Sequence, residues 1–259
     1  MSVRLVALGD STVCGMGDPL PDGSWRGFAG LLAATFPTSE YTNLAVSGAR
    51  TPHVRHGQLA AALELRPDLA CLLVGVNDTM RSDFAPAVVR AHLTETAAAL
   101  TGSGATLLTA RVHNHARVFG LPPLLGRPLW RRLCALNEIY DEVYERFGGV
   151  RVDLTSVSWI YERANWSVDR LHPSELGHRR LAHAFAVQLR DAGWPVAELP
   201  SLTASGGLPP TPLADLRWML VEGVPWAGRK ARDLVPWAAT LAGRELLRRA
   251  RLAERSPAS

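Results

Sequence analysis

Long hydrophobic runs are absent from this sequence of 259 residues. No apolar stretch approaches the ~20 residues that a membrane-spanning helix requires. The first apolar segment, residues 3–8, is shorter than the core of a secretory signal and leads directly into a glycine turn. These absences predict a soluble protein that resides in the cytoplasm.

Cysteine is scarce as well. The chain has three cysteines, an odd number, and two of them lie inside apolar runs. Such cysteines are usually small buried side chains, so we expect neither a disulfide framework nor a zinc site. His113 and His115 stand one residue apart with no cysteine or acidic residue near them in sequence. We therefore expect these histidines in a loop that lines a substrate pocket, and we predict no bound metal.

Positive charge is concentrated at the C-terminal end. The formal net charge is +4, yet residues 226–259 hold eight basic and three acidic side chains. The rest of the chain is therefore close to neutral, and no nucleic-acid partner is predicted. Four tryptophans lie in the last quarter of the chain, Trp194, Trp218, Trp226 and Trp237. This mixture suits peripheral contact with a membrane surface. It equally suits a helix packed on the rest of the protein with its arginines in water, which we favour.

Short apolar runs alternate with longer amphipathic segments through the first three quarters of the chain. They predict strands at residues 3–8, 41–46, 69–76, 105–110 and 150–154, and helices at residues 25–36, 54–65, 86–100, 129–147 and 174–192. An irregular loop rich in proline and glycine, residues 111–126, follows the fourth strand. Strands separated by helices imply right-handed crossovers. The expected fold is therefore α/β, with a five-stranded parallel sheet between two layers of helices.

The composition changes near residue 195. Residues 1–195 form the predicted catalytic domain, and residues 196–212 are rich in proline and glycine, which is typical of a linker. Residues 213–259 have a helical pattern and form the predicted basic C-terminal extension. No internal repeat is present. Neither the composition nor the pattern indicates an oligomeric state.

Reactive side chains follow the predicted strands at their carboxyl ends. Ser11 comes after the first strand, Gly48 after the second and Asn77 after the third, while Asp169 and His172 lie beyond the fifth. Ligands of open parallel sheets bind outside this edge. Chance placement would scatter such residues over both edges. The sequence therefore predicts one site at the carboxyl edge of the sheet.

The residue types at this edge suit nucleophilic catalysis. A serine hydroxyl needs a base that accepts its proton, and the base usually needs a carboxylate that orients it. The three-residue spacing lets Asp169 and His172 project from one turn, so that Asp169 can hold Nδ1–H and leave Nε2 to face Ser11. Hydrogen-bond donors for an oxyanion are also required. The candidates are the backbone N–H groups of Ser11 and Gly48 and the side-chain amide of Asn77.

Four sequence blocks resemble those of the SGNH, or GDSL, hydrolase family and occur in its order. They are Gly9-Asp10-Ser11, Asn43-Leu44-Ala45-Val46-Ser47-Gly48, Gly75-Val76-Asn77-Asp78 and Asp169-Arg170-Leu171-His172-Pro173. The resemblance implies a flavodoxin-like three-layer α/β/α sandwich, no cofactor, and ester hydrolysis through an acyl-enzyme. It also implies that Ser11, His172 and Asp169 are the nucleophile, base and orienting carboxylate. Thr12 departs from the family, in which leucine or isoleucine is frequent, but it is not part of the relay.

The whole chain is also similar to actinobacterial members of this family, down to the tail around residues 225–237. The expected substrate is a small-molecule acyl ester. Four further residues are candidates for substrate binding: Asp10, which we expect to tether its turn, and His113, Phe119 and Leu121 after the fourth strand. The same residues also permit acyl transfer, thioester cleavage or a non-catalytic binding role. A nucleotide or flavin binder is disfavoured, because no glycine-rich phosphate loop follows the first strand.

Overall fold

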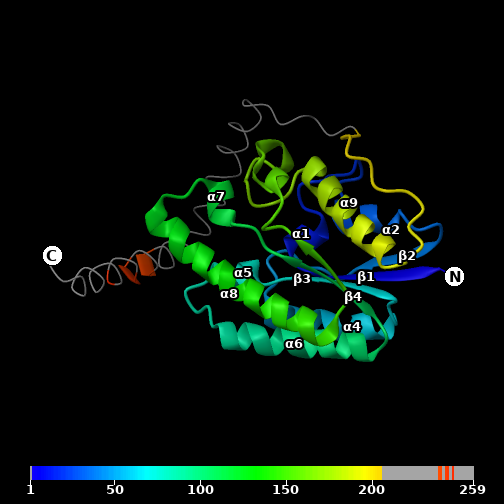
Figure 1. The fold of residues 1–259 in the computed structure, drawn as a ribbon, viewed down its shortest axis with the longest axis horizontal. Helices are drawn as coiled ribbons and strands as arrows, with labels where there is room; N and C mark the ends of the chain where they lie inside the picture. The colour runs from blue at the N-terminus through cyan, green and yellow to red at the C-terminus, as the bar shows by residue number, and fades with distance from the viewer. Residues whose placement is uncertain (1, 206–238, 241–242, 245–246, 248–259) are drawn as a thin grey trace.

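Five parallel strands form the central sheet (Figure 1). The computed structural model describes residues 2–205, 239–240, 243–244 and 247. The strands are β1 (Val3–Gly9), β2 (Ser39–Asn43), β3 (Leu69–Leu73), β4 (Thr106–Arg111) and β5 (Val150–Asp153). They lie in the order β2-β1-β3-β4-β5, and each neighbouring pair is parallel. This is the flavodoxin-like order, in which the chain changes direction across the sheet between β1 and β3.

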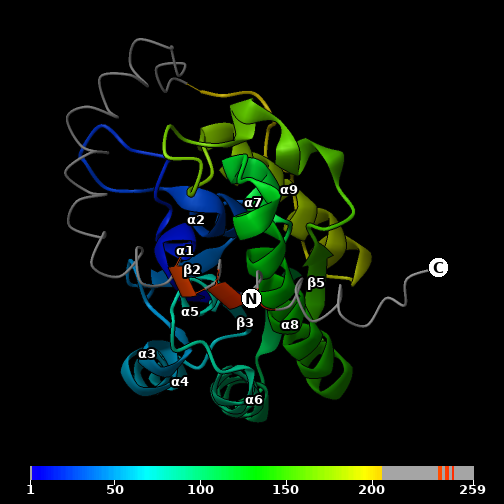
Figure 2. The same ribbon diagram turned by 90° about the vertical axis from the view of Figure 1, so that its left-hand side faces the viewer.

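Different helices cover the two faces of the sheet (Figures 1 and 2). The first face carries α2 (Gly27–Ala33) and α9 (Glu175–Asp191), and the second carries α4 (Leu59–Glu64), α6 (Pro86–Gly102) and α8 (Pro123–Phe147). Side chains alternate along a strand. Leu5 and Ala7 of β1 therefore pack under α2 and α9, whereas Val6 and Leu8 pack under the other three helices. The predicted three-layer α/β/α fold is confirmed.

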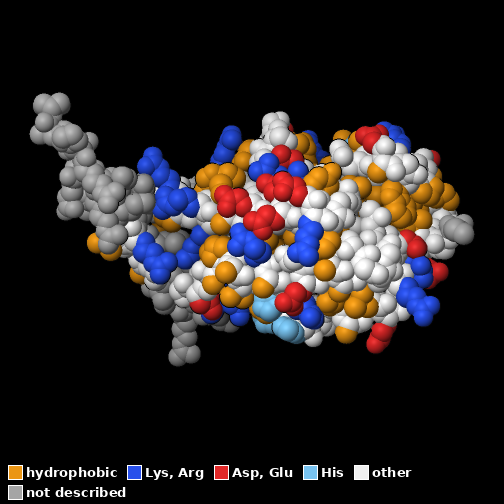
Figure 3. Space-filling view, turned by 60° about the horizontal axis from the view of Figure 1, so that its bottom comes forward, with side chains coloured by type: hydrophobic (Ala, Val, Ile, Leu, Met, Phe, Trp, Pro, Cys, Tyr) orange, Lys and Arg blue, Asp and Glu red, His pale blue; other side chains and the backbone are white. Residues whose placement is uncertain are grey.

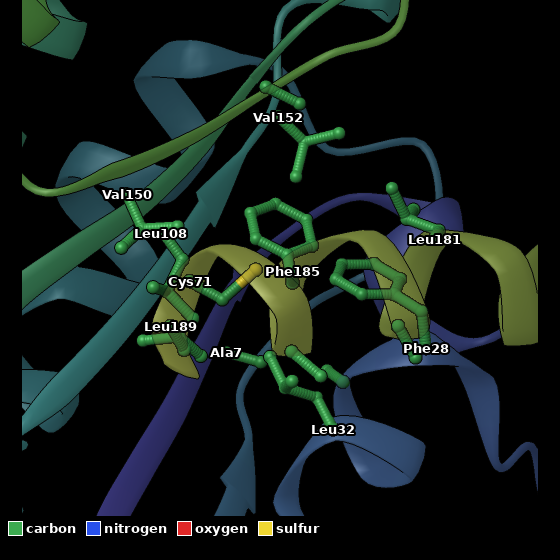
Figure 4. Packing of buried hydrophobic residues seen from close by; sticks show 14 of the residues in the cluster. Ala7, Phe28, Leu32, Cys71, Leu108, Val150, Val152, Leu181, Phe185 and Leu189 are labelled. Carbon is green, nitrogen blue, oxygen red and sulfur yellow. The ribbon is translucent and has the colours of Figure 1, made fainter. Parts of the chain in front are cut away.

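The ring of Phe185 lies at the centre of the core between the sheet and α9 (Figure 4). It stacks on Phe28 of α2 with a distance of 5.8 Å between ring centroids. The thiol of Cys71 on β3 belongs to the same cluster and is fully buried, and this burial raises its pKa. Cys71 thus packs as a small apolar side chain, as we expect from the apolar run around it.

The first strand after β1 lies earlier in the chain than predicted. We expect residues 41–46 from their apolar pattern, but β2 spans Ser39–Asn43. This strand lies at the edge of the sheet, and its residues are exposed or half-buried, so it needs no apolar run. Leu44 and Ala45 follow the strand and pack against opposite clusters of the core. The apolar residues therefore mark the loop after β2.

The predicted irregular loop at residues 111–126 is largely helical, which corrects that prediction. It contains α7 (His115–Phe119) and the first turn of α8, which begins at Pro123 and not at residue 129. Pro128 in the sequence favours a break, because proline has no N–H for the helical hydrogen bond. The helix nevertheless continues through Pro128, which is buried, and the adjoining Leu129 packs against α7 through Ala116.

Residues 196–205, the first part of the predicted linker, lie against the domain. The backbone N–H of Ala197 donates to the carbonyl of Thr35 at 2.8 Å, and the N–H of Ser205 donates to Glu175 of α9 at 2.8 Å. Val196 and Leu199 pack on the core. The predicted C-terminal extension, with the basic tail and three of its tryptophans, lies outside the described residues apart from positions 239–240, 243–244 and 247.

Basic and acidic side chains are interspersed on the face that carries α6 (Figure 3). Arg55 pairs with Glu95 at 2.9 Å, and Arg90 of α6 pairs with Glu142 of α8 at 2.7 Å. Exposed pairs of this kind contribute at most about 1 kcal/mol each. In the part of the chain that the structure describes, no helix has the length and apolar character needed to cross a membrane.

Candidate active site

Ser11 lies in a tight turn at the carboxyl end of β1. It begins the short helix α1 (Ser11–Cys14), which Asp10 caps by accepting the backbone N–H of Thr12 at 3.1 Å. A Cβ at Gly9, just before the turn, would lie 2.2 Å from the carbonyl oxygen of Leu73 on β3. Only glycine permits this close approach of two strands. The packing thereby fixes the direction in which Ser11 leaves the sheet.

Asp169 organises the loop that precedes α9. Its Oδ1 accepts the backbone N–H groups of Leu171 at 2.8 Å and His172 at 3.0 Å, together with the hydroxyl of Ser167 at 2.6 Å. Arg170, which lies between Asp169 and Leu171, adopts a left-handed conformation with φ of 54°. This conformation is unfavourable for a residue with a side chain. The hydrogen bonds to Asp169 hold the loop in a shape that the backbone alone disfavours.

A chain of short hydrogen bonds joins Asp169, His172 and Ser11. Nδ1 of His172 lies 2.6 Å from Oδ2 of Asp169, and Nε2 lies 2.8 Å from Oγ of Ser11. A carboxylate can only accept, so Nδ1 carries the hydrogen and Nε2 of the neutral ring accepts from the serine hydroxyl. Ser11 is 8% exposed and His172 is 9% exposed. The structure therefore brings these three residues together in the predicted order.

The carboxyl group of Asp169 is held in its ionised form. Burial by itself would raise its pKa, but the hydrogen bonds from His172 and Ser167 and the attraction of the imidazole outweigh burial and lower the pKa to about 2. Asp169 is therefore anionic at neutral pH.

The loop after α1 packs directly against the loop that carries His172. A Cβ at Gly17, where φ is 101°, would lie 1.9 Å from the carbonyl oxygen of Pro173. Both the conformation and the close contact therefore require glycine. The loop that extends from Ser11 and the loop that holds His172 are kept in contact at this point.

His178 of α9 ties the same two regions together. Its Nδ1 accepts the backbone N–H of Phe28 at 3.2 Å, so Nε2 carries the hydrogen and donates to the carbonyl of Met16 at 2.9 Å. Burial lowers the pKa of His178 to about 4. The ring is therefore a neutral structural link between α2, α9 and the loop after α1.

Two of the predicted oxyanion donors are backbone N–H groups that have no hydrogen-bond partner in the described part of the chain. They are the N–H groups of Ser11 and Gly48. Gly48 has φ of 77°, which favours glycine, and it is exposed. The Asn77 amide nitrogen donates to the carbonyl of Ala49 at 3.0 Å and more weakly to Asp10 at 3.3 Å. Asn77 thus connects the loop of Gly48 to the turn of Ser11.

A cavity of about 90 Å³ opens beside Ser11. Ser11, Asp10 and Asn77 lie on its wall together with apolar side chains from the ends of β3 and β4 and from α9, among them Leu73 and Leu181. Pockets for drug-sized ligands are several times larger, roughly 300–1,000 Å³. The cavity therefore has room for a small group next to the serine hydroxyl.

A serine, a histidine and a carboxylate in a hydrogen-bonded chain, at the carboxyl edge of a parallel sheet, is the arrangement of a serine hydrolase. The sequence model of the GDSL-like lipase/acylhydrolase family matches residues 7–180, more than half of the chain. The chain belongs to this family. The predicted resemblance is therefore confirmed, and this GDSL-family member is a carboxylic ester hydrolase.

Solved structures share the fold of this family member, among them two that are described as esterases. TesA is 22% identical with a TM-score of 0.55, and the match covers 73% of this chain and 98% of TesA. A variant of Axe2, an acetyl xylan esterase from Geobacillus stearothermophilus, is 21% identical with a TM-score of 0.58 and coverages of 76% and 99%. The psychrotrophic esterase EstA from Pseudoalteromonas sp. is 15% identical with a TM-score of 0.58 and coverages of 73% and 97%. No curated protein sequence matches significantly.

The structure separates the remaining predicted substrate-binding residues into two groups. Asp10 and His113 lie on the cavity wall, and so does His115. Phe119 and Leu121 do not line this cavity; they pack with Ala116, Leu129 and Leu133, in the small core between α7 and α8. Phe119, at the end of α7, and Leu121 pack toward α8 because their apolar side chains complete that core. Among the described residues, no cluster of three or more histidine, cysteine or acidic side chains could hold a metal ion.

Sequence analysis does not identify the part of the cavity wall formed by Trp159, Asn165 and Trp166. These residues lie between β5 and the loop of His172, in 3₁₀ turns that carry no helical or strand pattern. Trp166 forms an isolated antiparallel bridge with Pro173. In the sequence, only the position of Trp166 three residues before Asp169 indicates that this segment lies near the site, and it does not reveal which way the ring points.

Replacing Asp10 with asparagine is expected to stabilise this hydrolase at alkaline pH. Burial raises the pKa of Asp10 to about 6, against the opposing effects of the Thr12 N–H and His172. The folded protein thus buries a carboxylate above pH 6, which costs roughly 3 kcal/mol, whereas Asp10→Asn loses about one hydrogen bond of ~1 kcal/mol. We expect the free energy of unfolding in urea to rise by about 2 kcal/mol at pH 8.

This gain depends on pH in a defined direction. Above pH 6 the raised pKa of Asp10 lowers the free energy of unfolding by its full amount. This loss becomes smaller as the pH drops from 6 toward 3.8. Asp10→Asn should therefore gain almost nothing at pH 4.5. Asp22→Asn is the control, because the exposed Asp22 accepts the N–H of Ser24 in a similar turn at 2.9 Å without burial. An equal gain at both pH values would contradict the burial of a charged Asp10.

Proposed function

We propose that this family member hydrolyses small-molecule esters with Ser11 as nucleophile, His172 as general base and Asp169 as its orienting carboxylate. The observation that carries the proposal is the chain of hydrogen bonds at 2.6 and 2.8 Å from Asp169 through His172 to Ser11. Such a chain is what a serine hydroxyl needs in order to lose its proton during attack.

The first half of the reaction forms an acyl-enzyme. Oγ of Ser11 attacks the ester carbonyl carbon while its proton passes to Nε2 of His172. The carbonyl oxygen becomes an oxyanion, which the free N–H groups of Ser11 and Gly48 can bind. The Asn77 amide can also donate to the oxyanion if it gives up its weak hydrogen bond to Asp10. Collapse of this intermediate breaks the bond between the carbonyl carbon and the alkoxy oxygen. The alcohol leaves with the proton from His172.

The second half removes the acyl group. A water molecule gives its proton to Nε2 of His172 and attacks the carbonyl carbon bound to Ser11. The bond between this carbon and Oγ then breaks, Oγ recovers the proton, and the carboxylic acid leaves. Asp169 stays anionic throughout, because its pKa of about 2 lies far below neutral pH.

The size of the cavity supports a short acyl group. A volume of about 90 Å³ is several times smaller than the pockets of roughly 300–1,000 Å³ that hold drug-sized ligands. It favours an acyl chain of about two to four carbons over a long fatty acyl chain. The structurally similar Axe2 is described as an acetyl xylan esterase, which agrees with a small acyl group.

Trapping the acyl-enzyme tests this proposal. With p-nitrophenyl acetate we expect a burst of about one equivalent of p-nitrophenol, followed by slower turnover. Mass spectrometry of the acid-quenched protein should place one acetyl group on the peptide that contains Ser11. In steady state, kcat/KM should be highest for esters of two to four acyl carbons and fall at least about tenfold at octanoate. Acetylation of another residue, or a preference for octanoate, would contradict the proposal.

A further inference from the structure

Three polar side chains on the cavity wall beside Ser11 have hydrogen-bonding atoms without a partner. Among the described residues, both ring nitrogens of His113 and Oδ1 of Asn165 are buried and unpaired, and the buried ring of His115 has only a loose contact with the backbone of Leu171. The residues are 3%, 6% and 1% exposed, and all three line the same cavity. Buried polar groups in folded proteins are nearly always paired, because an unpaired group destabilises the fold. The proposed relay uses none of these atoms.

We refer to these three residues, which line the same cavity, as the patch. The rings of His113 and His115 lie 4.2 Å apart between centroids, and both contact Trp166, at 4.9 and 5.3 Å. Asn165 precedes Trp166, and its Nδ2 donates to the carbonyl of Trp159 at 2.7 Å and to Glu162 at 3.3 Å. Because both of these partners can only accept, the orientation of the amide is fixed and Oδ1 is left as the unpaired acceptor.

The other polar side chains deep in the cavity are satisfied. The indole N–H of Trp166 donates to the carbonyl of Ile160 at 2.6 Å. The hydroxyl of Tyr140 donates to the carbonyl of Val74 at 2.8 Å and accepts its N–H at 2.9 Å. Among the described residues of this wall, buried side-chain atoms without a hydrogen-bond partner therefore occur only in the patch of His113, His115 and Asn165, within surroundings that are otherwise mostly apolar.

The patch is electrically neutral. Burial lowers the pKa of His113 well below its usual range, and the nearby His115 adds to this effect. Burial also lowers the pKa of His115 to about 4, against a smaller opposing effect of the Leu171 backbone. Each neutral ring offers one N–H donor and one acceptor nitrogen. Within the described part of the chain, no lysine or arginine lines the cavity. The patch therefore suits an uncharged ligand group that both donates and accepts, and not a carboxylate.

The position of the cavity indicates which part of an ester enters it. The leaving alcohol must receive its proton from Nε2 of His172, so it lies on the His172 side of the carbonyl carbon. Ser11 and Asn77 line the cavity, and so do Leu171 and Pro173 on either side of His172. We assign the cavity to the acyl chain, because this part of the ester stays bonded to Oγ of Ser11 after the alcohol has left.

We propose that His113, His115 and Asn165 bind a hydroxyl group on the acyl part of the substrate, so that the enzyme prefers short hydroxyacyl esters to unsubstituted ones. This specificity rests on the proposed function of Ser11. The hydroxyl hydrogen is donated to Oδ1 of Asn165 or to a ring nitrogen, and the hydroxyl oxygen accepts an imidazole N–H. A plain alkyl chain of the same length leaves these groups unpaired, which discriminates against it.

The test compares kcat/KM for the p-nitrophenyl esters of 3-hydroxybutyrate and butyrate in the full chain. We expect the wild type to prefer the hydroxyl ester about tenfold, the effect of about one good hydrogen bond. His113→Leu should remove this preference, and His113→Gln, which keeps a donor and an acceptor, should restore part of it. The matched control is His92→Leu on α6, a half-buried histidine outside the cavity wall, which should leave the ratio unchanged.

A binding measurement decides the proposal without turnover. In the Ser11→Ala protein, 3-hydroxybutyramide should shift the imidazole resonances of His113 and His115 in ¹H–¹⁵N spectra more than butyramide does. Equal shifts, or a wild-type ratio near one that His113→Leu leaves unchanged, would overturn the proposed specificity even if Ser11 cleaves esters. If Ser11 cleaves no ester, the proposed function fails, and the two amides still decide whether the patch binds a hydroxyl.

Discussion

Ser11→Ala is expected to abolish ester hydrolysis while the fold remains intact. The hydroxyl that accepts the acyl group is lost, and neither the alanine methyl group nor the remaining His172–Asp169 pair can replace it. In serine hydrolases, loss of the nucleophile lowers kcat by roughly 10⁵–10⁶-fold. Only one hydrogen bond of the hydroxyl within the described protein disappears, the contact to Nε2 of His172 at 2.8 Å. The free energy of unfolding should therefore change by no more than about 1 kcal/mol.

The measurement is hydrolysis of p-nitrophenyl acetate by purified wild type and variant, with urea unfolding of both. Ser156→Ala is a suitable control. The hydroxyl of Ser156 donates to the carbonyl of Asp153 at 3.0 Å, just beyond the carboxyl end of β5, so its loss also removes one hydrogen bond near the same edge. This control should retain full activity. A Ser11→Ala protein with more than about one hundredth of the wild-type rate would refute Ser11 as nucleophile.

The sequence predicts the central strands well because they are buried on both faces. β1, β3 and β4 are short apolar runs that are followed by glycine or polar residues, and this pattern favours a buried parallel strand. The edge strand β2 is different. Its residues contact water, so its pairing with β1 is set by the backbone and not by apolar side chains. A sequence pattern based on burial therefore places this strand too late.

Placement of the reactive residues is predictable for a related reason. Parallel strands end at one edge, so residues that directly follow them, such as Ser11 and Asn77, must lie close together. The cavity wall does not obey this rule. Trp166 and Asn165 reach the wall through a turn after β5, and Phe119 leaves it to fill the core beside α8. These positions depend on packing between distant segments, which local sequence patterns do not record.

The same limit explains why His113 and His115 are only partly interpretable from sequence. Their position after the fourth strand indicates that they lie near the site. That both rings are buried against Trp166, and that neither nitrogen of His113 has a hydrogen-bond partner among the described residues, follows only from the fold. The unpaired atoms are what make these histidines a candidate for specificity, since a satisfied core histidine such as His178 carries no such implication.

Asp169→Asn is expected to reduce both catalysis and stability, with different pH dependences. Asparagine presents an N–H group to Nδ1 of His172 or rotates away, so Nδ1 is no longer held as the donor and Nε2 is no longer fixed as the base facing Ser11. Loss of the carboxylate also removes the charge that stabilises the imidazolium. We expect kcat for p-nitrophenyl acetate to fall about 10⁴-fold at pH 7.5.

The stability effect follows from the pKa of Asp169, which is lowered from 3.8 to about 2 in the folded protein. A lowered pKa contributes stability above pH 4, and this contribution is lost as pH falls toward 2. Asp169→Asn should therefore unfold more easily by roughly 2 kcal/mol at pH 7, with a smaller difference at pH 3.

Asp22→Asn is the control that separates the expected losses of kcat and stability from the effect of removing hydrogen bonds within a turn. Asp22 accepts the N–H and hydroxyl of Ser24 at 2.9 and 2.6 Å, as Asp169 accepts an N–H and a serine hydroxyl, but it lies in an exposed turn away from His172. This control removes a similar local pattern at the surface and should keep full activity. Equal activity of Asp169→Asn and the control would mean that His172 does not depend on Asp169 as a base. A loss of stability in Asp169→Asn without a loss of kcat would assign the carboxylate only to the loop around Arg170, whose left-handed conformation it supports.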